Sequence, residues 1–355
     1  MSAPTFSICI PNYNYARYLP RTIGSVLAQD GESLEVVIAD NASTDDSVRV
    51  IEAIGDPRVR VRVNACNVGF AGNLDRAARL ARGAYLNLLS SDDLMRPGAL
   101  ATARTIFDAV GTGAVVTSRM DLIDPDDVIT GTIGPDPTLW RAGDRDAALE
   151  AKLGAPVYRV AAGELLGRAL AGMRNPFNFA ATLYPRALYD AVEGYGGGRL
   201  INPDKWFHWK LLGVADHAIF VDRPGFAYRW HPGNQTAQQA ATGALKYLVD
   251  EYASTIELSA DKHLLARAGV DRDRVEAAFV EHDIARHGLA TLARGDRAKA
   301  RRILMFGGSV YPQHTSRNWK AWGLGALLAL GGVGERVARA AYARVAPERG
   351  SGKRA

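Results

Sequence analysis

Two adjacent carboxylates, Asp92 and Asp93, follow an apolar run and have the chemistry of a site for a divalent cation. Carboxylate oxygens are hard ligands of the kind that Mg²⁺ and Mn²⁺ accept, and a cation held there would neutralise charge on a departing phosphate group. The same pair precedes Leu94-Met95-Arg96-Pro97, where it could cap the next helix instead. The pair alone therefore leaves both interpretations open.

Polar side chains follow four predicted strands, at the point where each strand ends. They are Pro11-Asn12-Tyr13-Asn14, Asp40 through Asp45, the set Asn67, Gly69 and Asn73, and Ser90 through Asp93. Ligands bind outside the carboxyl ends of the strands in a parallel α/β sheet, so we expect these side chains to share one site. Asn and Asp are also common turn and cap residues, which is the alternative for each loop taken alone.

The elements that must position these residues alternate apolar runs with helical periodicity. Strands are predicted at Phe6–Ile10, Glu35–Ala39, Val59–Val63, Ala84–Leu89 and Ala114–Thr117. Helices are predicted from Tyr18, from the capping residues Asn41–Asp45 through Ile51, over Phe70–Leu80, and from Pro97. Strands separated by helical crossovers imply an α/β fold with a Rossmann-like, mostly parallel sheet flanked by helices.

The pattern loosens between Ser118 and Leu165, where turn signals predict a long surface excursion. It returns at Ala181–Val192, at a glycine-rich turn (194–198), in a helix over Asp204–Leu212, and in strands near Ala218–Val221 and Phe226–Trp230. Beyond Thr236 the chain is predicted to be helical, with breaks near Gly269, Gly295 and Pro312. We therefore predict a catalytic domain over 1–235 and a helical C-terminal region with a basic tail over 236–355.

The composition is that of a globular enzyme of 355 residues, with 47% hydrophobic and 23% charged residues. It excludes a disordered, fibrous or disulfide-stapled chain. Two cysteines, Cys9 and Cys66, are too few for a disulfide framework or a thiolate metal site. The first apolar run lacks a basic leader, and no apolar run is long enough to span a bilayer, so we expect a cytoplasmic protein.

The net charge of +5 is unevenly placed, because the tail from Tyr311 to Ala355 carries eight Lys/Arg against Glu335 and Glu348. The rest of the chain is close to neutral, so nucleic acid is not expected as a partner. The tail also holds Trp319, Trp322 and the apolar run 321–333, followed by Arg336, Arg339 and Arg344. This mixture fits a helix lying in a membrane interface, and it equally fits a helix packed on the protein with a solvated basic face.

Several motifs in sequence order resemble the inverting family 2 glycosyltransferases of the GT-A fold. The first four are PNYN, VVIADNASTDDS, NVGFAGN and ARGAYLNLLSSDDL. Two more follow, formed by Gly194-Tyr-Gly-Gly-Gly with Asn202–Leu211, and by Tyr228-Arg-Trp-His231 with Asn234. The resemblance covers about residues 5 to 235 and implies transfer of a sugar from a nucleoside-diphosphate sugar, with UDP or dTDP favoured.

The resemblance also implies roles for individual residues. Pro11 and Tyr13 would line the nucleobase, with Asn14 also in the donor site, and Asp40 would accept a hydrogen bond from a pyrimidine N–H. Asn67, Gly69 and Asn73 would approach ribose and diphosphate. Asp93 would lie in the donor site beside Asp92, and Arg229 could neutralise phosphate. Asp92 would bind the metal, Mg²⁺ or Mn²⁺, directly or through water. His231 would touch the metal or the diphosphate, and the alternative for it is a hydrogen-bonded histidine of the core. The family commonly has Asp-x-Asp where this chain has Ser90-Ser91-Asp92, so one carboxylate is lost and the affinity for metal is in question.

Asp204 is the predicted catalytic base, because inverting transfer needs a carboxylate that takes the proton of the attacking hydroxyl. The alternative is an Asp that caps its helix. Trp206 and Trp209, three residues apart, are predicted to be core rather than sugar contacts, and His208 is predicted to be structural or exposed.

The acceptor is left open among a surface glycan, a lipid-linked saccharide and a secondary-metabolite aglycone. The irregular stretch 119–180 and the C-terminal region are expected to determine which of them is bound. Two other functions are weighed. A nucleotidyltransferase would show a Gly-rich basic loop where this chain has Pro11-Asn-Tyr-Asn. A non-catalytic nucleotide-sugar or glycan-binding module is suggested by Ser90.

Overall fold

The computed structural model describes residues 3–196, 200, 203–234 and 244–345. The chain forms two compact units. Unit 1 comprises Met1–Leu166 and Asn175–His231, and unit 2 comprises Gly167–Arg174 and Pro232–Ala355. Asn202, part of the glycine-rich turn and the end of the basic tail lie outside the described residues. The predicted division at residue 235 stays a prediction, and the two units are described separately below.

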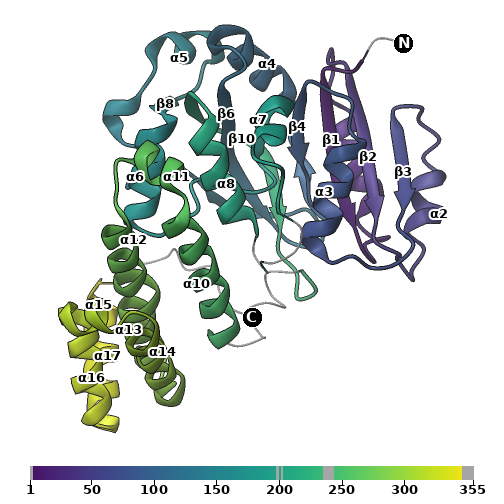
Figure 1. Cartoon of the computed structure of the whole chain (residues 1–355). Coiled ribbons are helices and arrows are strands. Elements are labelled where there is room, and N and C mark those ends of the chain that lie inside the picture. The colour runs from purple at the N-terminus through teal and green to yellow at the C-terminus, as the bar shows by residue number, and fades with distance from the viewer. Residues whose placement is uncertain (1–2, 197–199, 201–202, 235–243, 346–355) are drawn as a thin grey trace. The chain divides into compact units, whose positions relative to one another are not determined.

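Unit 1 is built on a mixed sheet whose order in the described chain is β3-β2-β1-β4-β9-β6-β10-β5, with β7 beside β6 and β8 beside β10 (Figure 1). Strands β3, β2, β1 and β4 are parallel, as are β6 and β10, while β9 runs antiparallel between β4 and β6. The strands are β1 (Phe6–Asn12), β2 (Leu34–Asp40), β3 (Val59–Val63), β4 (Tyr85–Leu88), β5 (Leu94–Met95), β6 (Ala114–Ile123), β7 (Ile129–Ile133), β8 (Val157–Ala161), β9 (Thr182–Pro185) and β10 (His217–Arg229).

Helices cover both faces of this sheet, so β1 and β2 are buried along their whole length. Phe6, Ile8 and Ile10 pack in one core with Leu19 and Ile23 of the first helix. Such double-sided burial explains why β1 and β2 are apolar throughout instead of alternating. The helices are α1 (Leu19–Leu27), α2 (Ser47–Glu52), α3 (Phe70–Leu80), α4 (Ala99–Val110), the 3-10 helix η1 (Ala142–Asp144), α5 (Ala147–Leu153), α6 (Ala162–Ala171), α7 (Arg186–Ala191) and α8 (Pro203–Val214).

The predicted α/β class with a mostly parallel sheet is confirmed, and two local predictions are wrong. The stretch after Ser118 is no surface excursion, because it holds the end of β6, then β7, α5, β8 and the start of α6. The two strands predicted near 218–221 and 226–230 are one strand, β10. Its register against β6 shifts on either side of Pro224, a residue that has no N–H to give to the ladder.

Unit 2 is helical in its described part, and the predicted breaks at Gly269, Gly295 and Pro312 are confirmed. Gly269 and Gly295 adopt positive φ (65° and 91°) between successive helices. No helix in the described ranges is both long and apolar enough to cross a bilayer. The helices are α10 (Ala244–Ala260), α11 (Lys262–Ala268), α12 (Arg272–Phe279), the π-helix η2 (Val280–Arg286), α13 (His287–Ala293), α14 (Arg297–Val310), α15 (Pro312–Arg317), α16 (Trp319–Ala329) and α17 (Gly332–Val345).

Candidate functional site

The loops after β1, β2, β3 and β4 are tied to one another at the carboxyl edge of the parallel strands. The Asn41 N–H donates to the Asn12 carbonyl at 2.8 Å, and the Asn64 N–H donates to the Asp40 carbonyl at 2.8 Å. The Ser91 hydroxyl donates to the carbonyl of β1 residue Pro11 at 2.7 Å. The polar residues that the sequence assigned to separate strand ends therefore share one edge.

Asp40 is fully buried at the end of β2 and accepts three hydrogen bonds from the protein. They come from the Asn12 amide (2.7 Å), the Ser43 N–H (2.9 Å) and the Ser43 hydroxyl (2.7 Å). These bonds fix the orientation of the carboxylate before any ligand arrives. The predicted bond from a pyrimidine N–H to Asp40 stays a prediction, and its geometry would be set by Asn12 and Ser43.

Tyr13 and Asn14 form the turn that leaves β1. Asn14 adopts a positive φ of 61°, which Asn tolerates better than most residues. Its N–H donates to the Ser43 hydroxyl (3.0 Å), and its side-chain oxygen accepts from the Thr44 N–H (2.8 Å). Asn14 thus holds the turn, while Tyr13 is 43% exposed and presents its ring at the edge. An exposed ring at this place could stack on a nucleobase.

A cluster of asparagines joins the loops after β2 and β3 to α3. The Asn41 amide donates to Asn67 (2.8 Å), and the Asn64 amide donates to both Asn41 (3.0 Å) and Asn73 (2.9 Å). Asn73 also donates to the Ala39 carbonyl at 2.8 Å. Asn67 and Asn73 are predicted to approach ribose and diphosphate. In the structure their side chains form hydrogen bonds with other protein groups and hold the loop that contains Gly69.

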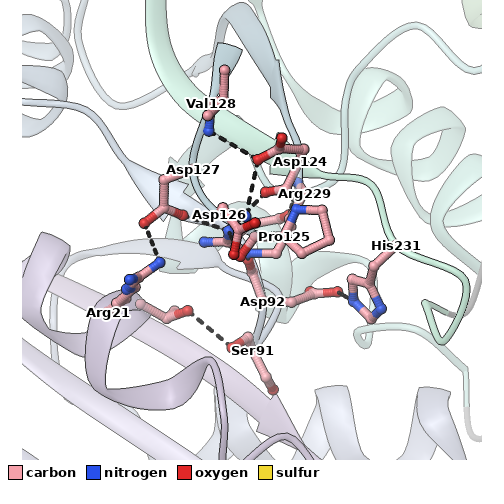
Figure 2. A network of polar contacts seen from close by, with 12 residues as sticks. Arg21, Ser91, Asp92, Asp124, Pro125, Asp126, Asp127, Val128, Arg229 and His231 are labelled. Atoms are coloured by element: carbon pink, nitrogen blue, oxygen red, sulfur yellow. Dashed lines mark hydrogen bonds and ion pairs between the residues drawn. The ribbon is translucent and has the colours of Figure 1, made fainter. Parts of the chain in front are cut away.

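Asp92 follows β4 and faces His231, which follows β10 (Figure 2). The His231 Nε2 lies 3.0 Å from the Asp92 Oδ2, and both residues are buried, with 7% of each exposed. The His231 ring packs against Tyr18, with ring centroids 4.9 Å apart. Burial raises the pKa of the adjacent Tyr15, and the carboxylates of Asp92 and Asp93 raise it further. The two residues predicted to bind metal are therefore in direct contact.

Asp93 points away from solvent, and the protein interior surrounds it completely. Its Oδ1 accepts from the Arg229 N–H at 2.9 Å, and the Ser90 hydroxyl also bonds to this carboxyl group. Burial, reinforced by the neighbouring Asp92, raises the pKa of Asp93 well above the ordinary value of an aspartate. Ser90, at the position where the resemblance predicts a carboxylate, therefore hydrogen-bonds to Asp93.

Arg229 corrects a prediction, because its buried position leaves no surface for a phosphate. The side chain is 0% exposed, and its guanidinium donates to the carbonyls of Asp92 (2.7 Å), Asp124 (3.0 Å) and Pro125 (3.3 Å). It also lies over the Tyr18 ring, 5.0 Å from its centroid. Arg229 holds the backbone at Asp92 in place instead of binding the donor.

The turn between β6 and β7 closes over this arginine, as Figure 2 shows. Asp127 pairs with Arg229 and, at 2.6 Å, with Arg21 of α1. Asp127 adopts a positive φ of 70° in this turn. The Asp124 carboxylate accepts from the Val128 N–H at 3.0 Å and closes the turn. One carboxylate thus joins α1, the β6–β7 turn and β10 around the loop that carries Asp92.

Asp204 lies in a second polar network, in the first turn of α8. Its Oδ2 accepts from the Asn175 amide at 2.8 Å. On the same helix Trp209 is fully buried, as predicted for a core residue, whereas Trp206 is only partly buried. His208 is 1% exposed and structural, one of the two roles predicted for it. The bond between Asn175 and Asp204 shares no residue with the contact between Asp92 and His231.

The residues at Asp92 fit a divalent cation that takes some of its ligands from the protein and the others from a bound diphosphate. The described parts of the chain contain no group of three His, Cys, Asp or Glu that could hold a metal alone. Mg²⁺ sites commonly use one or two carboxylates with phosphate oxygens and water, and Mn²⁺ also accepts imidazole nitrogen. Asp92 and His231 supply such a set.

Sequence reasoning placed Asn12 and Asn41 at the shared edge without a role, and it missed Asn64, Asp127 and Asn175. Asn12, Asn41 and Asn64 orient the loops at the sheet edge, Asp127 holds Arg229, and Asn175 holds Asp204. A dense run of asparagines at the strand ends was the available signal for the first three. Asp127 and Asn175 act across 102 and 29 residues of sequence, and no local pattern marks them.

Residues 7–156 match the family described as "Glycosyl transferase family 2". Chondroitin synthase of Escherichia coli is 40% identical over 99 residues, which cover 27% of this chain and 14% of that protein. The succinoglycan biosynthesis protein ExoO of Rhizobium meliloti is 34% identical over 123 residues, 35% of each chain. The chain thus spans well under two thirds of these relatives.

Similarity to solved structures extends over nearly the whole chain. A crystal structure of S. aureus TarS 1-349 in complex with UDP-GlcNAc has a TM-score of 0.65 and 16% sequence identity, and covers 98% of this chain and 95% of its own. The same protein in complex with UDP gives a TM-score of 0.57 with 15% identity over the same shares of the two chains. At this identity the likeness establishes the fold.

Proposed function

The chain carries a family 2 glycosyltransferase domain in a GT-A fold, and on that premise we propose that it moves a sugar from a nucleoside-diphosphate sugar to an acceptor hydroxyl. The observation that carries the proposal is the carboxyl edge of the sheet. There Tyr13 is exposed, Asp40 is oriented, and Asp92 contacts His231. A nucleobase can stack on an aromatic face and donate to a buried acceptor, and its diphosphate can bind a cation that two side chains hold.

The donor is proposed to be a UDP- or dTDP-linked sugar bound with Mg²⁺ or Mn²⁺. Tyr13 would stack on the pyrimidine, and Asp40 would read its N–H. Asp92 and His231 would hold the cation, which when bound supplies positive charge to the leaving diphosphate. UDP in the structural neighbour, at the same fold, supports the choice of a pyrimidine donor.

Transfer is proposed to invert the anomeric centre, with Asp204 as the base. The acceptor oxygen forms its bond to the anomeric carbon on the face opposite the nucleotide, and the bond from that carbon to the diphosphate oxygen breaks. Asp204 takes the hydroxyl proton as the oxygen attacks. Its place in the first turn of α8, with one oxygen held by Asn175, supports this role.

The acceptor is proposed to be a surface glycan, a lipid-linked saccharide or a secondary-metabolite aglycone, and the protein to act in the cytoplasm. Cys9 is buried as a thiol and Cys66 is exposed as a thiol, in keeping with a reducing compartment. A non-catalytic nucleotide-sugar or glycan-binding module is the alternative, since Ser90 replaces a carboxylate. A nucleotidyltransferase is less favoured, because the turn after β1 has neither glycine nor lysine.

A thermal-shift screen with UDP-, dTDP- and GDP-sugars tests the proposal. We expect a UDP- or dTDP-sugar with Mn²⁺ to raise the melting temperature, and a donor at 100 times its Kd contributes about 2.7 kcal/mol of stability. The same donor should then be hydrolysed slowly without acceptor, and the binding-module alternative predicts stabilisation with no hydrolysis. A protein that no nucleotide sugar stabilises, with or without metal, contradicts the proposal.

Unit 2 bears a surface that we propose contacts the inner face of a membrane. Trp319, Trp322 and Met305 are 75%, 69% and 65% exposed, and Trp322 lines a shallow groove together with Leu304 of α14. Residues 297–334 include six Lys/Arg and no Asp or Glu. Exposed tryptophans within a basic segment suit the interface of an anionic bilayer, where each Lys or Arg contributes about 1 kcal/mol.

Vesicle co-sedimentation checks this contact. We expect binding to phosphatidylglycerol-containing vesicles, little binding to phosphatidylcholine alone, and at least a tenfold loss of binding in the double variant Trp319→Ser/Trp322→Ser. Val249→Ser/Ile256→Ser is the matched control, because these α10 side chains are 51% and 47% exposed. The membrane contact is excluded if both double variants bind the vesicles equally well. It is also excluded if the protein self-associates so that the two tryptophans are covered by a second copy.

A further inference from the structure

We infer that Asn175 and His208 are positioning residues that hold Asp204 in the orientation and charge state of a base. Nothing in the motifs of the sequence marks either residue for this role. The inference rests on the proposed function of Asp204. It adds a chain of two hydrogen bonds, from the His208 imidazole to the Asn175 amide and from that amide to the Asp204 carboxylate.

The orientation of the Asn175 amide follows from its other partner. The Asn175 Oδ1 accepts from the Phe177 backbone N–H at 3.3 Å, and a backbone N–H can only donate. The Nδ2 end must therefore face Asp204, whose Oδ2 lies 2.8 Å away. The amide donates to the carboxylate, and a donor at that place favours the ionised form that can accept a proton.

The same oxygen fixes the tautomer of His208. Its Nδ1 lies 2.7 Å from the Asn175 Oδ1, and since that oxygen can only accept, the proton must sit on Nδ1. Burial lowers the pKa of His208 to about 3, so the ring is a neutral donor at working pH. Phe177 packs edge-on against the ring, with centroids 5.3 Å apart.

These contacts do more than fill the interior around α8. Asn175 lies in the irregular segment before β9, and Asp204 lies at the solvent-facing start of α8, where it is only partly buried. The chain of bonds therefore orients one oxygen of this carboxylate. The neighbouring Tyr195 keeps its own proton and is no alternative base, because burial, Tyr184 and the Asp204 charge all raise its pKa.

The first test is spectroscopic and does not depend on turnover. In protein labelled with ¹⁵N-histidine, we expect the His208 signal, assigned with His208→Asn, to show a neutral ring protonated on Nδ1. Asn175→Ala should shift that signal towards the Nε2-protonated form, because the acceptor is gone. A wild-type ring protonated on Nε2, or one that titrates near its ordinary value of about 6.5, overturns the inference.

The second test separates positioning from simple structural support. Asn175→Ala should lower kcat about 10- to 100-fold with donor KM unchanged, and should move the acidic limb of the kcat/KM profile to higher pH by roughly one unit. His208→Leu should lower kcat less, and His208→Asn, whose amide nitrogen replaces Nδ1, should restore it. His217→Asn is the histidine control, because His217 contacts Arg159 instead.

The outcomes for the two proposals are distinct. If Asp204→Asn keeps its turnover, the base is wrongly assigned and the proposed mechanism fails with it. If Asp204→Asn is inactive while Asn175→Ala keeps wild-type kcat and an unmoved acidic limb, the positioning role alone is rejected. The positioning role is also rejected if Asn175→Ala loses donor affinity together with kcat and if His208→Asn is no more active than His208→Leu.

Discussion

Asp204→Asn should abolish sugar transfer while donor binding is retained. Removing a general base lowers the rate of such a step by roughly 10²- to 10⁴-fold. Asparagine keeps the shape of the side chain and can still accept from the Asn175 amide through its oxygen, so α8 should fold as before. The measurement is kcat with a radiolabelled or mass-tagged donor, set beside donor affinity by calorimetry.

The matched control for this variant is Asp190→Asn. Asp190 is an exposed carboxylate on α7, and its loss should leave kcat within about twofold, since exposed surface substitutions usually have small effects. Equal loss in both variants would point to general damage. Substantial turnover by Asp204→Asn would show that another group takes the proton.

Asp92→Ala should remove metal-dependent donor binding. The carboxylate is the oxygen ligand that the site offers a cation, and the cation in turn supports the diphosphate, so we expect the donor Kd in Mn²⁺ to rise at least 100-fold, which is about 2.7 kcal/mol. Without metal the wild type and the variant should bind the nucleotide almost equally. Calorimetric titration of nucleotide with and without Mn²⁺ measures both.

Two further variants guard this result against loss of folding. Asp92→Asn keeps an oxygen that can accept from His231, so it should preserve the contact at 3.0 Å while it weakens the metal. Asp126→Asn removes an exposed carboxylate on the nearby β6–β7 turn and should change neither. Unchanged Mn²⁺-dependent affinity in Asp92→Ala would remove Asp92 from the metal site.

The elements that local pattern specifies were predicted closely. The strand Val59–Val63 and the helix Phe70–Leu80 have the predicted bounds, because each is framed by its own turn residues and carries its own periodicity. Gly69, with φ of 78°, starts that helix in a conformation that glycine adopts readily. The parallel direction of β1, β2, β3 and β4 was predicted from the helical crossovers between them, whereas the antiparallel β9 between β4 and β6 was not.

What the sequence could not reveal depends on contacts between distant segments. Arg229 looked like a phosphate ligand because an arginine in a motif suggests charge pairing, yet Asp127 and the Asp124 carbonyl occupy it inside the fold. Asn67 and Asn73 looked exposed to ligand, yet Asn41 and Asn64 bind them first. Such pairings leave no trace in periodicity.

The burial of Arg229 under the β6–β7 turn means that the first 156 residues of the chain cannot complete the loop at Asp92 by themselves. The segment that matches the family ends at residue 156, well before Arg229 and His231 join the loop at Asp92. During synthesis this loop must wait for β10 to emerge before it acquires its final shape. A chimaera that exchanges donor segments between relatives would need to carry the β10 partner along with them.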